Sequence, residues 1–447
     1  MDATTLAAYD KAVPRYTSYP TAAQFDARVG PADHAAWLGA LSGRFATVYL
    51  HVPFCAQLCW YCACNTMAMN RAGPLDAYAR AMMAELDRVA GLAPGLIVGA
   101  IQWGGGTPSQ LGTRRLVDVA RHLAARFDRR SGAEVSMEID PRHCPDELVE
   151  AMTRVGVTRA SLGVQDFDPG VQHAINRLQS AETTADVLDR LRRAGIRRIN
   201  IDLVYGLPRQ SLSTLSRTLD AALALAPDRF AVFGYAHVPW MKPRQRLIEQ
   251  AELPGTALRA EMAALVSERV SGAGYRRIGL DHFARPDDSL AKAEACGRLR
   301  RTFQGYVADD SPWVVGIGAS AISSLPAGYT QNIAVADRYG AALETGMLAT
   351  ARGVALSDAD RLRGEIINRL MCLQAIDLAE VCRRHRVEPV SFLADIDALP
   401  RLVEDGLVDR EGDVLRITDR GRPLVRSVCA AFDNHFTPGP ERHARAI

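Results

Sequence analysis

The chain has 447 residues, of which 48% are hydrophobic and 23% charged, and its formal net charge is +2. This length suits two domains or one large α/β domain with an appendage, and the composition is ordinary for a soluble globular enzyme. The near-neutral charge gives no support to a protein that binds nucleic acid or an acidic membrane surface.

Two further features indicate where the protein works. Residues 1–20 contain no apolar core of a signal peptide, and no apolar run is long enough to span a bilayer. Four of the nine cysteines cluster and the other five are scattered, which is not the pattern of a disulfide framework. We therefore expect a cytoplasmic protein with no membrane partner.

Residues 1–45 are expected to form an arm that leads into the main fold. The run from Arg15 to Ala22 reads R-Y-T-S-Y-P-T-A and has neither helical nor strand periodicity. Taken alone, it would be an irregular terminus packed on the surface. Residues 32–41 are expected to form a short helix.

From about residue 46 to residue 235, short β-branched runs alternate with stretches of helical apolar periodicity. Crossover helices between consecutive strands require parallel strands. Six such units are two short of a closed eight-stranded barrel, so the sequence predicts a partial, open (β/α)6 barrel. The expected strands are 47–52, 97–103, 134–139, 159–164, 198–204 and 229–233, and the expected helices include 76–89, 114–127, 183–193 and 213–225.

The rest of the chain is expected to complete a catalytic domain of residues 46–340 and to add a domain of residues 341–447. Extra strands around 303–306 and 316–323 would widen the sheet. The last domain is predicted to be mainly helical and winged-helix-like, with helices at 365–373, 378–385 and 400–405 and a hairpin over 407–417. No basic stripe stands out in it, which favours a substrate lid or scaffold over DNA binding.

Polar or glycine-rich residues follow the expected strands. The active sites of parallel barrels lie at the C-terminal ends of the strands, so these residues should share one rim. They are the cysteine cluster at 55–64, the glycine run at 104–108, Glu138 and Asp140, Gln165, Asp202, and the tripeptide at 235–237.

The cysteine cluster follows the first strand and reads Y-L-H-V-P-F-C-A-Q-L-C-W-Y-C-A-C-N-T over residues 49–66. Several thiolates in one tight loop suit a soft metal or an iron–sulfur cluster. Structural zinc usually needs a second pair of ligands, and none with that spacing occurs elsewhere. The C-x-x-x-C-x-x-C spacing of Cys55, Cys59 and Cys62 can hold three corners of a four-iron cluster, which leaves the fourth iron open. The alternative is four structural thiols.

This loop resembles the signature of radical S-adenosylmethionine (SAM) enzymes. Cys64 extends it to C-x-x-C-x-C, which resembles the narrower family of oxygen-independent coproporphyrinogen III oxidases. The R-Y-T-S-Y-P-T-A arm is similar to the arm that approaches the active site in that family. The resemblance covers Arg15 to about Asn332 by motif and the C-terminal domain more loosely. It implies a [4Fe–4S] cluster on Cys55, Cys59 and Cys62, while Cys64 is not expected to ligate iron.

The resemblance also implies which residues contact SAM, of which the family holds two molecules. The glycine run at 104–108 lacks the pattern of a phosphate loop and would otherwise be a strand-ending turn. In the family it lets SAM approach the strand edge. A carboxylate such as Asp202 in an apolar strand needs a partner, for which Arg177 is a candidate. The expected contacts are Tyr49, Tyr61, Cys64, Gly105, Gly106, Thr107, Glu138, Gln165, Arg177, Asp202, Ala236, Gln304 and Ile322.

Some of these positions also have an ordinary explanation. Tyr49 and Ile322 would otherwise be core residues, and a lone Glu138 would be a surface residue or a helix cap. Tyr61 replaces the Phe of familiar relatives but keeps an aromatic face. The five scattered cysteines are expected to be structural thiols: Cys144, Cys296, Cys372, Cys382 and Cys429.

The function implied by the resemblance is the oxygen-independent conversion of coproporphyrinogen III to protoporphyrinogen IX in haem biosynthesis. Two propionates lose CO₂ and become vinyl groups. The unactivated C–H bond calls for a 5′-deoxyadenosyl radical, formed from SAM at the cluster. The reaction needs an electron donor and an electron acceptor of unknown identity, and we expect a monomer that has no nucleic-acid partner. The substrate is a tetracarboxylate, and Arg15 and His51 are candidate cations for it.

Three alternatives remain from the sequence. A haem-chaperone relative shares the barrel and three cysteines, but it typically lacks the fourth cysteine and the arm. An iron–sulfur electron-transfer or sensing protein with a DNA-binding tail would form no 5′-deoxyadenosine. A radical SAM haem methyltransferase would transfer a methyl group to a porphyrin.

Overall fold

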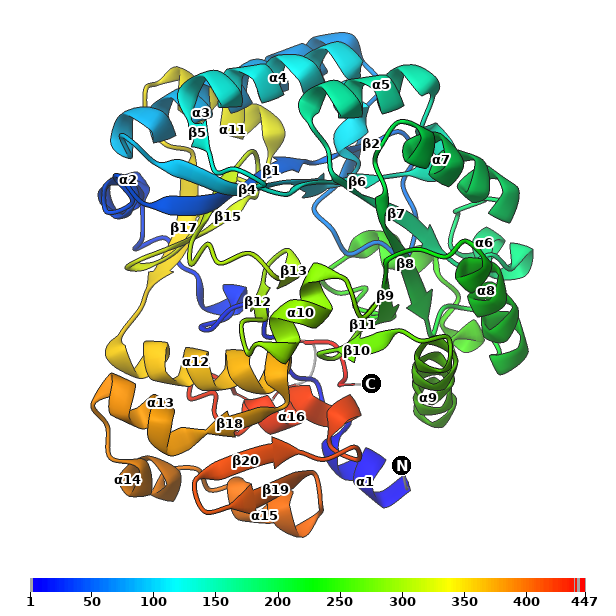
Figure 1. The fold of residues 1–447 in the computed structure, drawn as a ribbon, viewed down its shortest axis with the longest axis vertical. Helices are drawn as coiled ribbons and strands as arrows, with labels where there is room; N and C mark the ends of the chain where they lie inside the picture. Colours follow the sequence, from blue (N-terminus) through cyan, green and yellow to red (C-terminus); the bar gives the residue numbers. More distant parts are fainter. Residues whose placement is uncertain (1–2, 438, 440–442, 447) are drawn as a thin grey trace.

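The computed structural model describes residues 3–437, 439 and 443–446. A long curved sheet with helices on its outer face occupies the upper part of Figure 1, and the smaller C-terminal domain lies beneath it. The two ends of the chain lie near each other, at one side of that domain.

Six parallel strands in the order β9-β8-β7-β6-β4-β1 form the open barrel, so the predicted architecture is confirmed. Both ends of each strand lie within about two residues of the predicted bounds. The strands are β1 (Phe45–Val52), β4 (Ile97–Gly105), β6 (Val135–Ile139), β7 (Arg159–Gln165), β8 (Arg198–Tyr205) and β9 (Arg229–Gly234).

Helices connect these strands and cover the outer face of the sheet (Figure 1). Their ends follow local capping: Ser180 and Ser211 accept hydrogen bonds from the amides three residues on, and Gly156 ends a helix in the left-handed conformation. They are α3 (Ala72–Leu92), α4 (Thr113–Arg126), α5 (Asp146–Val155), α6 (Pro169–Ala174), α7 (Ala181–Arg193), α8 (Leu212–Ala224) and α9 (Thr256–Gly272).

Further strands extend the barrel sheet at both edges. On one side lie β14 (Val314–Ile317), parallel to β1, and the antiparallel β15 (Ile322–Leu325), β16 (Gly328–Asn332) and β17 (Thr350–Ala355). On the other lie β11 (His282–Ala284) and β10 (Arg276–Ile278). The predicted extra strands near 316–323 are therefore confirmed, with a turn at Gly318.

The prediction for residues 303–306 is wrong. Residues 303–304 form the turn, and residues 305–306 begin the second strand, of a separate hairpin of β12 (Arg300–Thr302) and β13 (Gly305–Val307), which does not join the main sheet. The remaining small elements of this part are β2 (Phe54–Cys55), β3 (Met67–Ala68), β5 (Asp128–Arg129), α10 (Ser289–Ala295), α11 (Ala336–Glu344), and the 3-10 helices η2 (Pro108–Leu111), η3 (Pro141–His143), η4 (Pro243–Leu247) and η5 (Gln250–Glu252).

The C-terminal domain combines helices with a three-stranded antiparallel sheet in the order β18-β20-β19, as the winged-helix-like prediction requires. The predicted hairpin turns at Gly412. The elements are α12 (Asp358–Leu373), β18 (Ala375–Asp377), α13 (Leu378–His385), α14 (Pro389–Ala394), α15 (Leu399–Glu404), β19 (Val408–Glu411), β20 (Val414–Ile417), η6 (Arg422–Leu424) and α16 (Val425–Ala430).

The N-terminal arm packs mainly into this C-terminal domain. Leu6, Val13, Tyr16 and Tyr19 belong to the same buried cluster as Leu415 and its neighbours. The arm contains α1 (Ala3–Tyr9), η1 (Ala22–Gln24) and α2 (Pro31–Gly39), and the last of these lies beside α3 and β17. The arm is therefore a structural part of the C-terminal core.

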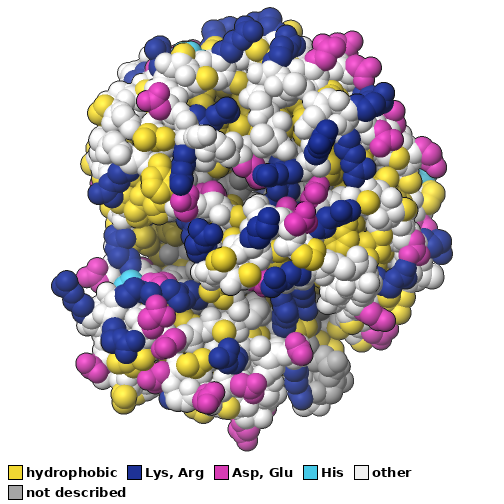
Figure 2. Space-filling view, in the orientation of Figure 1, with side chains coloured by type: hydrophobic (Ala, Val, Ile, Leu, Met, Phe, Trp, Pro, Cys, Tyr) yellow, Lys and Arg dark blue, Asp and Glu magenta, His cyan; other side chains and the backbone are white. Residues whose placement is uncertain are grey.

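The surface and the thiols add two observations. On the face in Figure 2, basic and acidic side chains are mixed over the C-terminal domain rather than gathered by sign. Among the described residues, no helix is both long and apolar enough to cross a bilayer. Cys144, Cys372, Cys382 and Cys429 are buried as expected, whereas Cys296 is exposed, so the structural assignment of that thiol is wrong.

Candidate active site at the cysteine loop

The cysteine loop leaves the C-terminal end of β1 and is held by backbone hydrogen bonds. Thr107 N–H donates to Phe54 O over 2.8 Å, and Trp60 N–H donates to Ile175 O over 3.0 Å. The side chain of Gln245 donates to Tyr61 O over 2.8 Å. Hydrogen bonds from three other parts of the barrel thus hold the loop, which carries the three predicted ligands.

The three thiols differ in their surroundings. Burial raises the pKa of Cys55 to about 11. A hydrogen bond from Thr107 Oγ1 to Cys55 Sγ, at 3.7 Å, has the opposite but smaller effect on this pKa. A hydrogen bond from Cys64 lowers the pKa of Cys62 to about 6, although burial acts to raise this pKa. Cys64 itself is exposed. The loop therefore favours the thiolate form of Cys62. The hydrogen bond that stabilises this thiolate comes from Cys64, which is not an expected ligand.

The loop fits a cluster better than a single ion. Within the described part of the chain, no three His, Cys, Asp or Glu side chains converge where one metal ion could bind. A four-iron cluster binds each cysteine at a different iron, so its ligands need not converge in this way. Gly106 leaves room beside the loop, because a Cβ there would lie 3.0 Å from Cys55 Sγ and 2.6 Å from Phe54 O. The three thiols and this space fit a [4Fe–4S] cluster.

The glycine run ends β4 against side chains of the barrel. A Cβ on Gly104 would lie 3.0 Å from both Glu138 Oε1 and Tyr49, and one on Gly105 would lie 2.7 Å from the His51 ring. Gly105 also has a φ of 114°, a conformation that favours glycine. These glycines are therefore required by the protein's own packing, in addition to any approach by SAM.

Two carboxylates lie close together inside the barrel. Burial, with Asp202 nearby, raises the pKa of Glu138 to about 8, although Gly105 N–H donates to Glu138 Oε2 over 3.1 Å. Burial also raises the pKa of Asp202, which accepts hydrogen bonds from Ser161 Oγ at 3.1 Å and from Asn200 Nδ2 at 2.7 Å. Glu138 is thus predominantly protonated at neutral pH and can donate a hydrogen bond.

A cavity of about 560 Å³ holds both carboxylates, and Gln304 lines it from the turn between β12 and β13. The structure thereby brings three predicted cofactor contacts to one space. Tyr49 does not line this cavity but packs against Gly104, next to Glu138. Ala236 and Ile322 do not line this cavity: Ala236 faces a second cavity, and Ile322 begins β15 beside β14.

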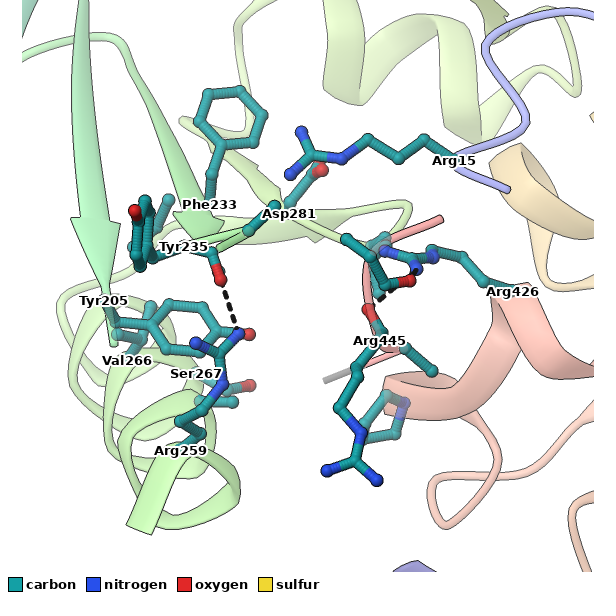
Figure 3. Close-up of a pocket in the computed structure, with 18 of the residues that line it drawn as sticks. Arg15, Tyr205, Phe233, Tyr235, Arg259, Val266, Ser267, Asp281, Arg426 and Arg445 are labelled. Atoms are coloured by element: carbon teal, nitrogen blue, oxygen red, sulfur yellow. Dashed lines mark hydrogen bonds between the residues drawn. The ribbon is translucent and has the colours of Figure 1, made fainter. Parts of the chain in front are cut away.

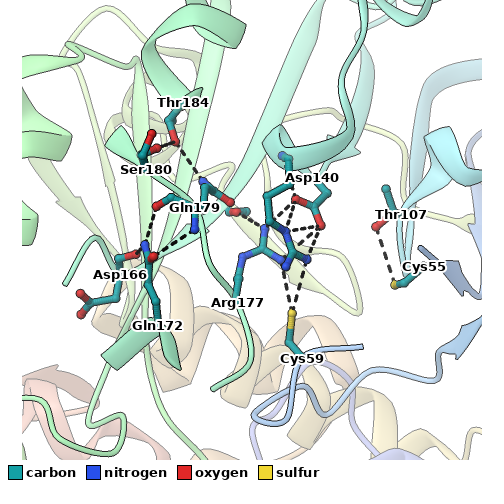
Figure 4. A network of polar contacts seen from close by, with 12 residues as sticks. Cys55, Cys59, Thr107, Asp140, Asp166, Gln172, Arg177, Gln179, Ser180 and Thr184 are labelled. Atoms are coloured by element: carbon teal, nitrogen blue, oxygen red, sulfur yellow. Dashed lines mark hydrogen bonds and ion pairs between the residues drawn. The ribbon is translucent and has the colours of Figure 1, made fainter. Parts of the chain in front are cut away.

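Arg177 binds Asp140 and not Asp202, so the predicted pairing is wrong. Its guanidinium lies 3.2 Å from Asp140 Oδ1 and donates to Cys59 Sγ over 3.4 Å (Figure 4). Arg142 lies 2.6 Å from the other oxygen of Asp140 and 3.7 Å from Cys59 Sγ. Asp202 instead accepts hydrogen bonds from Asn200 and Ser161. The register between β7 and β8 places Ser161 directly opposite Asn200.

Two positive charges therefore lie against the thiol of one predicted cluster ligand, Cys59. Their buried carboxylate partner ionises readily: against the effect of burial, Arg142 and Arg177 lower the pKa of Asp140 to about 2. Tyr61 lies in the same surroundings, since burial raises its pKa while Arg177 opposes this. Gln165 ends β7 with a φ of 73°, beside Gly163 and the Arg177 side chain. This group can bind an anion beside the cluster loop.

His51 is not a cation for the substrate. It is buried, and burial lowers its pKa to about 4. Its ring instead lies within hydrogen-bonding distance of Tyr49 OH, at 3.0 Å, and of Ser320 Oγ, at 3.2 Å. The other predicted cation, Arg15, lines the same second cavity as Ala236.

The sequence analysis missed two residues of the site. Arg142 lies two residues beyond Asp140, and the run D-P-R after a strand end was a usable signal for it. Gln245 is fully buried and bonds to Val238 N, Tyr61 O and Ala236 O. No sequence pattern distinguishes this glutamine from its neighbours in a polar segment.

Comparisons with known proteins agree with this geometry. The family model of the Radical SAM superfamily matches residues 49–222, and that of the HemN C-terminal domain matches residues 356–424. An oxygen-independent coproporphyrinogen III oxidase of Bradyrhizobium diazoefficiens is 47% identical and covers 98% of both chains. One from Pseudomonas aeruginosa is 38% identical over 100% of this chain and 98% of its own.

A solved structure shows the same fold. Coproporphyrinogen III oxidase from Escherichia coli, described as a radical SAM enzyme, is 35% identical with a TM-score of 0.90. The match covers 94% of this chain and 98% of that one. The likeness therefore extends over the barrel, the arm and the C-terminal domain together.

Proposed function

Because the chain belongs to the oxygen-independent coproporphyrinogen III oxidase family of radical SAM enzymes, we propose that it converts coproporphyrinogen III to protoporphyrinogen IX. The reaction oxidatively decarboxylates two propionates. Each loses one hydrogen atom, one electron and CO₂, and becomes a vinyl group. The observation that carries this proposal is the loop of three thiols at the C-terminal end of β1, within a chain that matches these oxidases over nearly its whole length.

The residues of the chain take distinct parts in this proposal. Cys55, Cys59 and Cys62 hold the cluster, and Cys64 stabilises the Cys62 thiolate through its hydrogen bond. When bound, the cluster and SAM supply the radical chemistry that removes hydrogen from an unactivated carbon. Arg142 and Arg177 balance negative charge at Cys59.

The remaining predicted contacts are assigned to SAM on the support of their positions. The protonated Glu138 can donate a hydrogen bond to groups in the barrel cavity, and Asp202, whose pKa burial raises, lines the same cavity. The full assignment is Tyr49, Tyr61, Cys64, Gly105, Gly106, Thr107, Glu138, Gln165, Arg177, Asp202, Ala236, Gln304 and Ile322. That two SAM molecules are bound rests on the family resemblance.

Three further features belong to the proposal. The reaction would need an electron donor, and an electron acceptor for the electron left by each decarboxylation. The protein acts as a monomer in this proposal. It works in the reducing cytoplasm, which is supported by its nine free cysteines.

An anaerobic assay tests the function. The cluster is reconstituted, SAM, a reductant and coproporphyrinogen III are added, and porphyrins and 5′-deoxyadenosine are followed by chromatography. We expect the divinyl product from the wild type, no product from Cys62→Ala, and a cluster that still forms in Cys64→Ala. A protein with a full cluster that forms neither product would overturn the proposal, and deoxyadenosine without porphyrin conversion would favour the methyltransferase or chaperone alternatives.

A further inference from the structure

A second cavity lies between the barrel and the C-terminal domain, and it is unusually rich in arginine. Its lining comes from the ends of β8 and β9, from α9, from the N-terminal arm and from residues near the C-terminus (Figure 3). Among the described residues that line it are six arginines and a single carboxylate, that of Asp281. The arginines are Arg15, Arg259, Arg277, Arg301, Arg426 and Arg445.

Some of these arginines are already occupied by the protein. Arg426 donates to the carbonyls of Val13, Ala444 and Arg445, and Arg259 donates to Tyr235 O over 2.8 Å. Arg445 pairs with Asp10 at 3.6 Å, outside the cavity. These three hold the walls in place, so they are not the first candidates to bind a ligand.

Three others retain donors that no protein group uses. Arg301 is 7% exposed and lies 3.7 Å from Asp281, yet its Nε and Nη1 make no hydrogen bond. The buried Nε of Arg277 also has no partner. Among the described residues, none accepts a hydrogen bond from Arg15, whose guanidinium points toward Asp281 in Figure 3. Buried donors without partners are rare in folded proteins, and an anion would satisfy them.

The electrostatics of the cavity point the same way. Burial, together with Arg422, lowers the pKa of Arg277 to about 10, and burial, together with Arg15 and Arg301, lowers that of Arg426 to about 9. Asp281 cannot balance this charge alone. Although burial opposes its ionisation, Arg301, His282 and Arg15 hold its pKa well below the usual range. The cavity therefore carries an excess of positive charge that a further carboxylate would offset.

The size and place of the cavity select the ligand. Its volume of about 70 Å³ corresponds to roughly five to seven water-sized spheres, which is enough for one propionate side chain and far too little for a tetrapyrrole. The ring of Phe233 lines both this cavity and the barrel cavity that holds Glu138 and Asp202. Arg15 also lies within electrostatic range of the Cys64 thiol. A carboxylate held here would be attached to a molecule that extends toward the cysteine loop.

We propose that this cavity binds one propionate carboxylate of the substrate, through Arg15, Arg277 and Arg301. The inference rests on the proposed function, and it names residues that would position the substrate, which the proposed function left unassigned. Arg15 belongs to the N-terminal arm and is exposed to solvent. It can therefore meet a carboxylate that enters from outside, while Arg277 and Arg301 form the inner wall.

Equilibrium binding of coproporphyrin III, the stable oxidised form of the tetracarboxylate, tests the proposal by porphyrin fluorescence. Its tetraamide is the matched probe, because it keeps the ring and the length of the side chains but lacks their charge. We expect Arg15→Gln to weaken binding of the tetracarboxylate about ten- to hundredfold and to leave binding of the tetraamide unchanged. Arg277→Gln should act in the same direction. Arg121→Gln on the outer face of α4, where the side chain is exposed, is the control and should change neither affinity.

Two outcomes would overturn the inference: an unchanged affinity of Arg15→Gln for the tetracarboxylate, or an equal loss for both probes. Arg301 is buried over the Tyr306 ring, so Arg301→Gln is interpreted only if its thermal unfolding matches the wild type. The anaerobic assay separates this inference from the function. Wild-type conversion with an unchanged KM in Arg15→Gln sinks the inference alone. If binding of the tetracarboxylate depends on the arginines but neither deoxyadenosine nor divinyl product forms, the proposed function is wrong and the inferred carboxylate site is supported.

Discussion

At Asp140, one buried carboxylate faces two buried guanidinium groups beside the cysteine loop. The side chains of Asp140, Arg142 and Arg177 are all less than a tenth exposed. Removing one partner of a buried ionic group leaves the others charged and unpaired, which is far more destabilising than the loss of a surface pair.

Asp140→Ala should therefore lower the free energy of unfolding by about 3–5 kcal/mol, measured by urea denaturation of the protein without its cluster. Asp87→Ala is the matched control. Asp87 pairs with Arg126 and His122, but it is 43% exposed, so its loss should cost about 1 kcal/mol or less. Equal effects of the two substitutions would contradict this account of the ionic group.

Glu85 provides a pH-dependent test away from the cysteines. It lies on α3, is buried, and accepts hydrogen bonds from Gly318 N–H and Asn332 Nδ2, both at 2.7 Å, and from Tyr339 OH at 2.5 Å. Burial, against these three bonds, raises its pKa from 4.5 to about 7. Because the folded pKa is the higher one, the folded state binds the proton more tightly, and stability falls as pH rises from 4.5 through 7.

The stability of Glu85→Gln relative to the wild type should thus increase by about 3 kcal/mol across this pH window and be constant above it. Urea denaturation of both proteins at several pH values measures the difference. A difference that is independent of pH, or that changes in favour of the wild type as pH rises, would show that folding does not raise the pKa of Glu85.

At the scale of elements, the cysteine loop depends on a segment far from it in sequence. Gln245, in η4, joins the loop at Tyr61 O to the end of β9 at Ala236 O, and it also accepts from Val238 N–H at 2.6 Å. Its side chain is fully buried. One amide group therefore holds two loops at the rim of the barrel.

Gln245→Ala should speed hydrogen–deuterium exchange of residues 58–64 and 236–241 by at least about tenfold, since each lost bond to a buried group is worth about 1–3 kcal/mol. Iron retained after reconstitution should fall in parallel. Gln57→Ala is the control from the same loop, because the Gln57 bond to Asn176 is exposed and 3.3 Å long. Exchange that is unchanged in Gln245→Ala would remove this residue from the support of the loop.

The sequence predicted the elements whose signals are local. β-branched runs and capping serines place the barrel strands and helices, and the spacing of the cysteines places the loop. Pairings between distant side chains were harder to predict. The sequence makes Arg177 a candidate partner of Asp202 because a carboxylate in an apolar strand needs one, but Asn200 and Ser161, at adjacent strand positions, already donate hydrogen bonds to Asp202.

The arginine cavity shows the same limit. Its side chains come from the arm, α9, β10, β12 and α16, and no period in the sequence relates them. Residues 303–306 likewise have the composition of a strand, but Gly305 lies at a φ of 107° and the chain forms a separate hairpin there. Such features follow from tertiary packing, which a local pattern does not encode.

At the scale of the whole molecule, the two ends of the chain meet. Ala12 pairs with Arg445 as an isolated β-bridge, and Tyr16 OH donates to Asp433 over 3.0 Å. Tyr16 is 2% exposed and lies within the core of the C-terminal domain. The arm therefore contributes to the stability of a domain more than 300 residues away in sequence.

Tyr16→Ala should lower the free energy of unfolding by about 3–5 kcal/mol, because it leaves a cavity in this core. Tyr16→Phe keeps the ring and should cost only about 1 kcal/mol for the lost hydrogen bond. Chemical denaturation measures both, and limited proteolysis should show the C-terminal domain of Tyr16→Ala cleaved first. An alanine variant as stable as the phenylalanine variant would place the arm on the surface instead.

The meeting of the two ends also sets an order of events during synthesis on the ribosome. The barrel strands are complete once residue 234 has emerged, and domains generally fold as units as they emerge. The arm cannot reach its final place until Asp433 and Arg445 have been translated. The nascent barrel thus passes through a stage in which its cysteine loop is formed but the arginine cavity is still open, and cluster insertion at that stage would meet no obstruction from the arm.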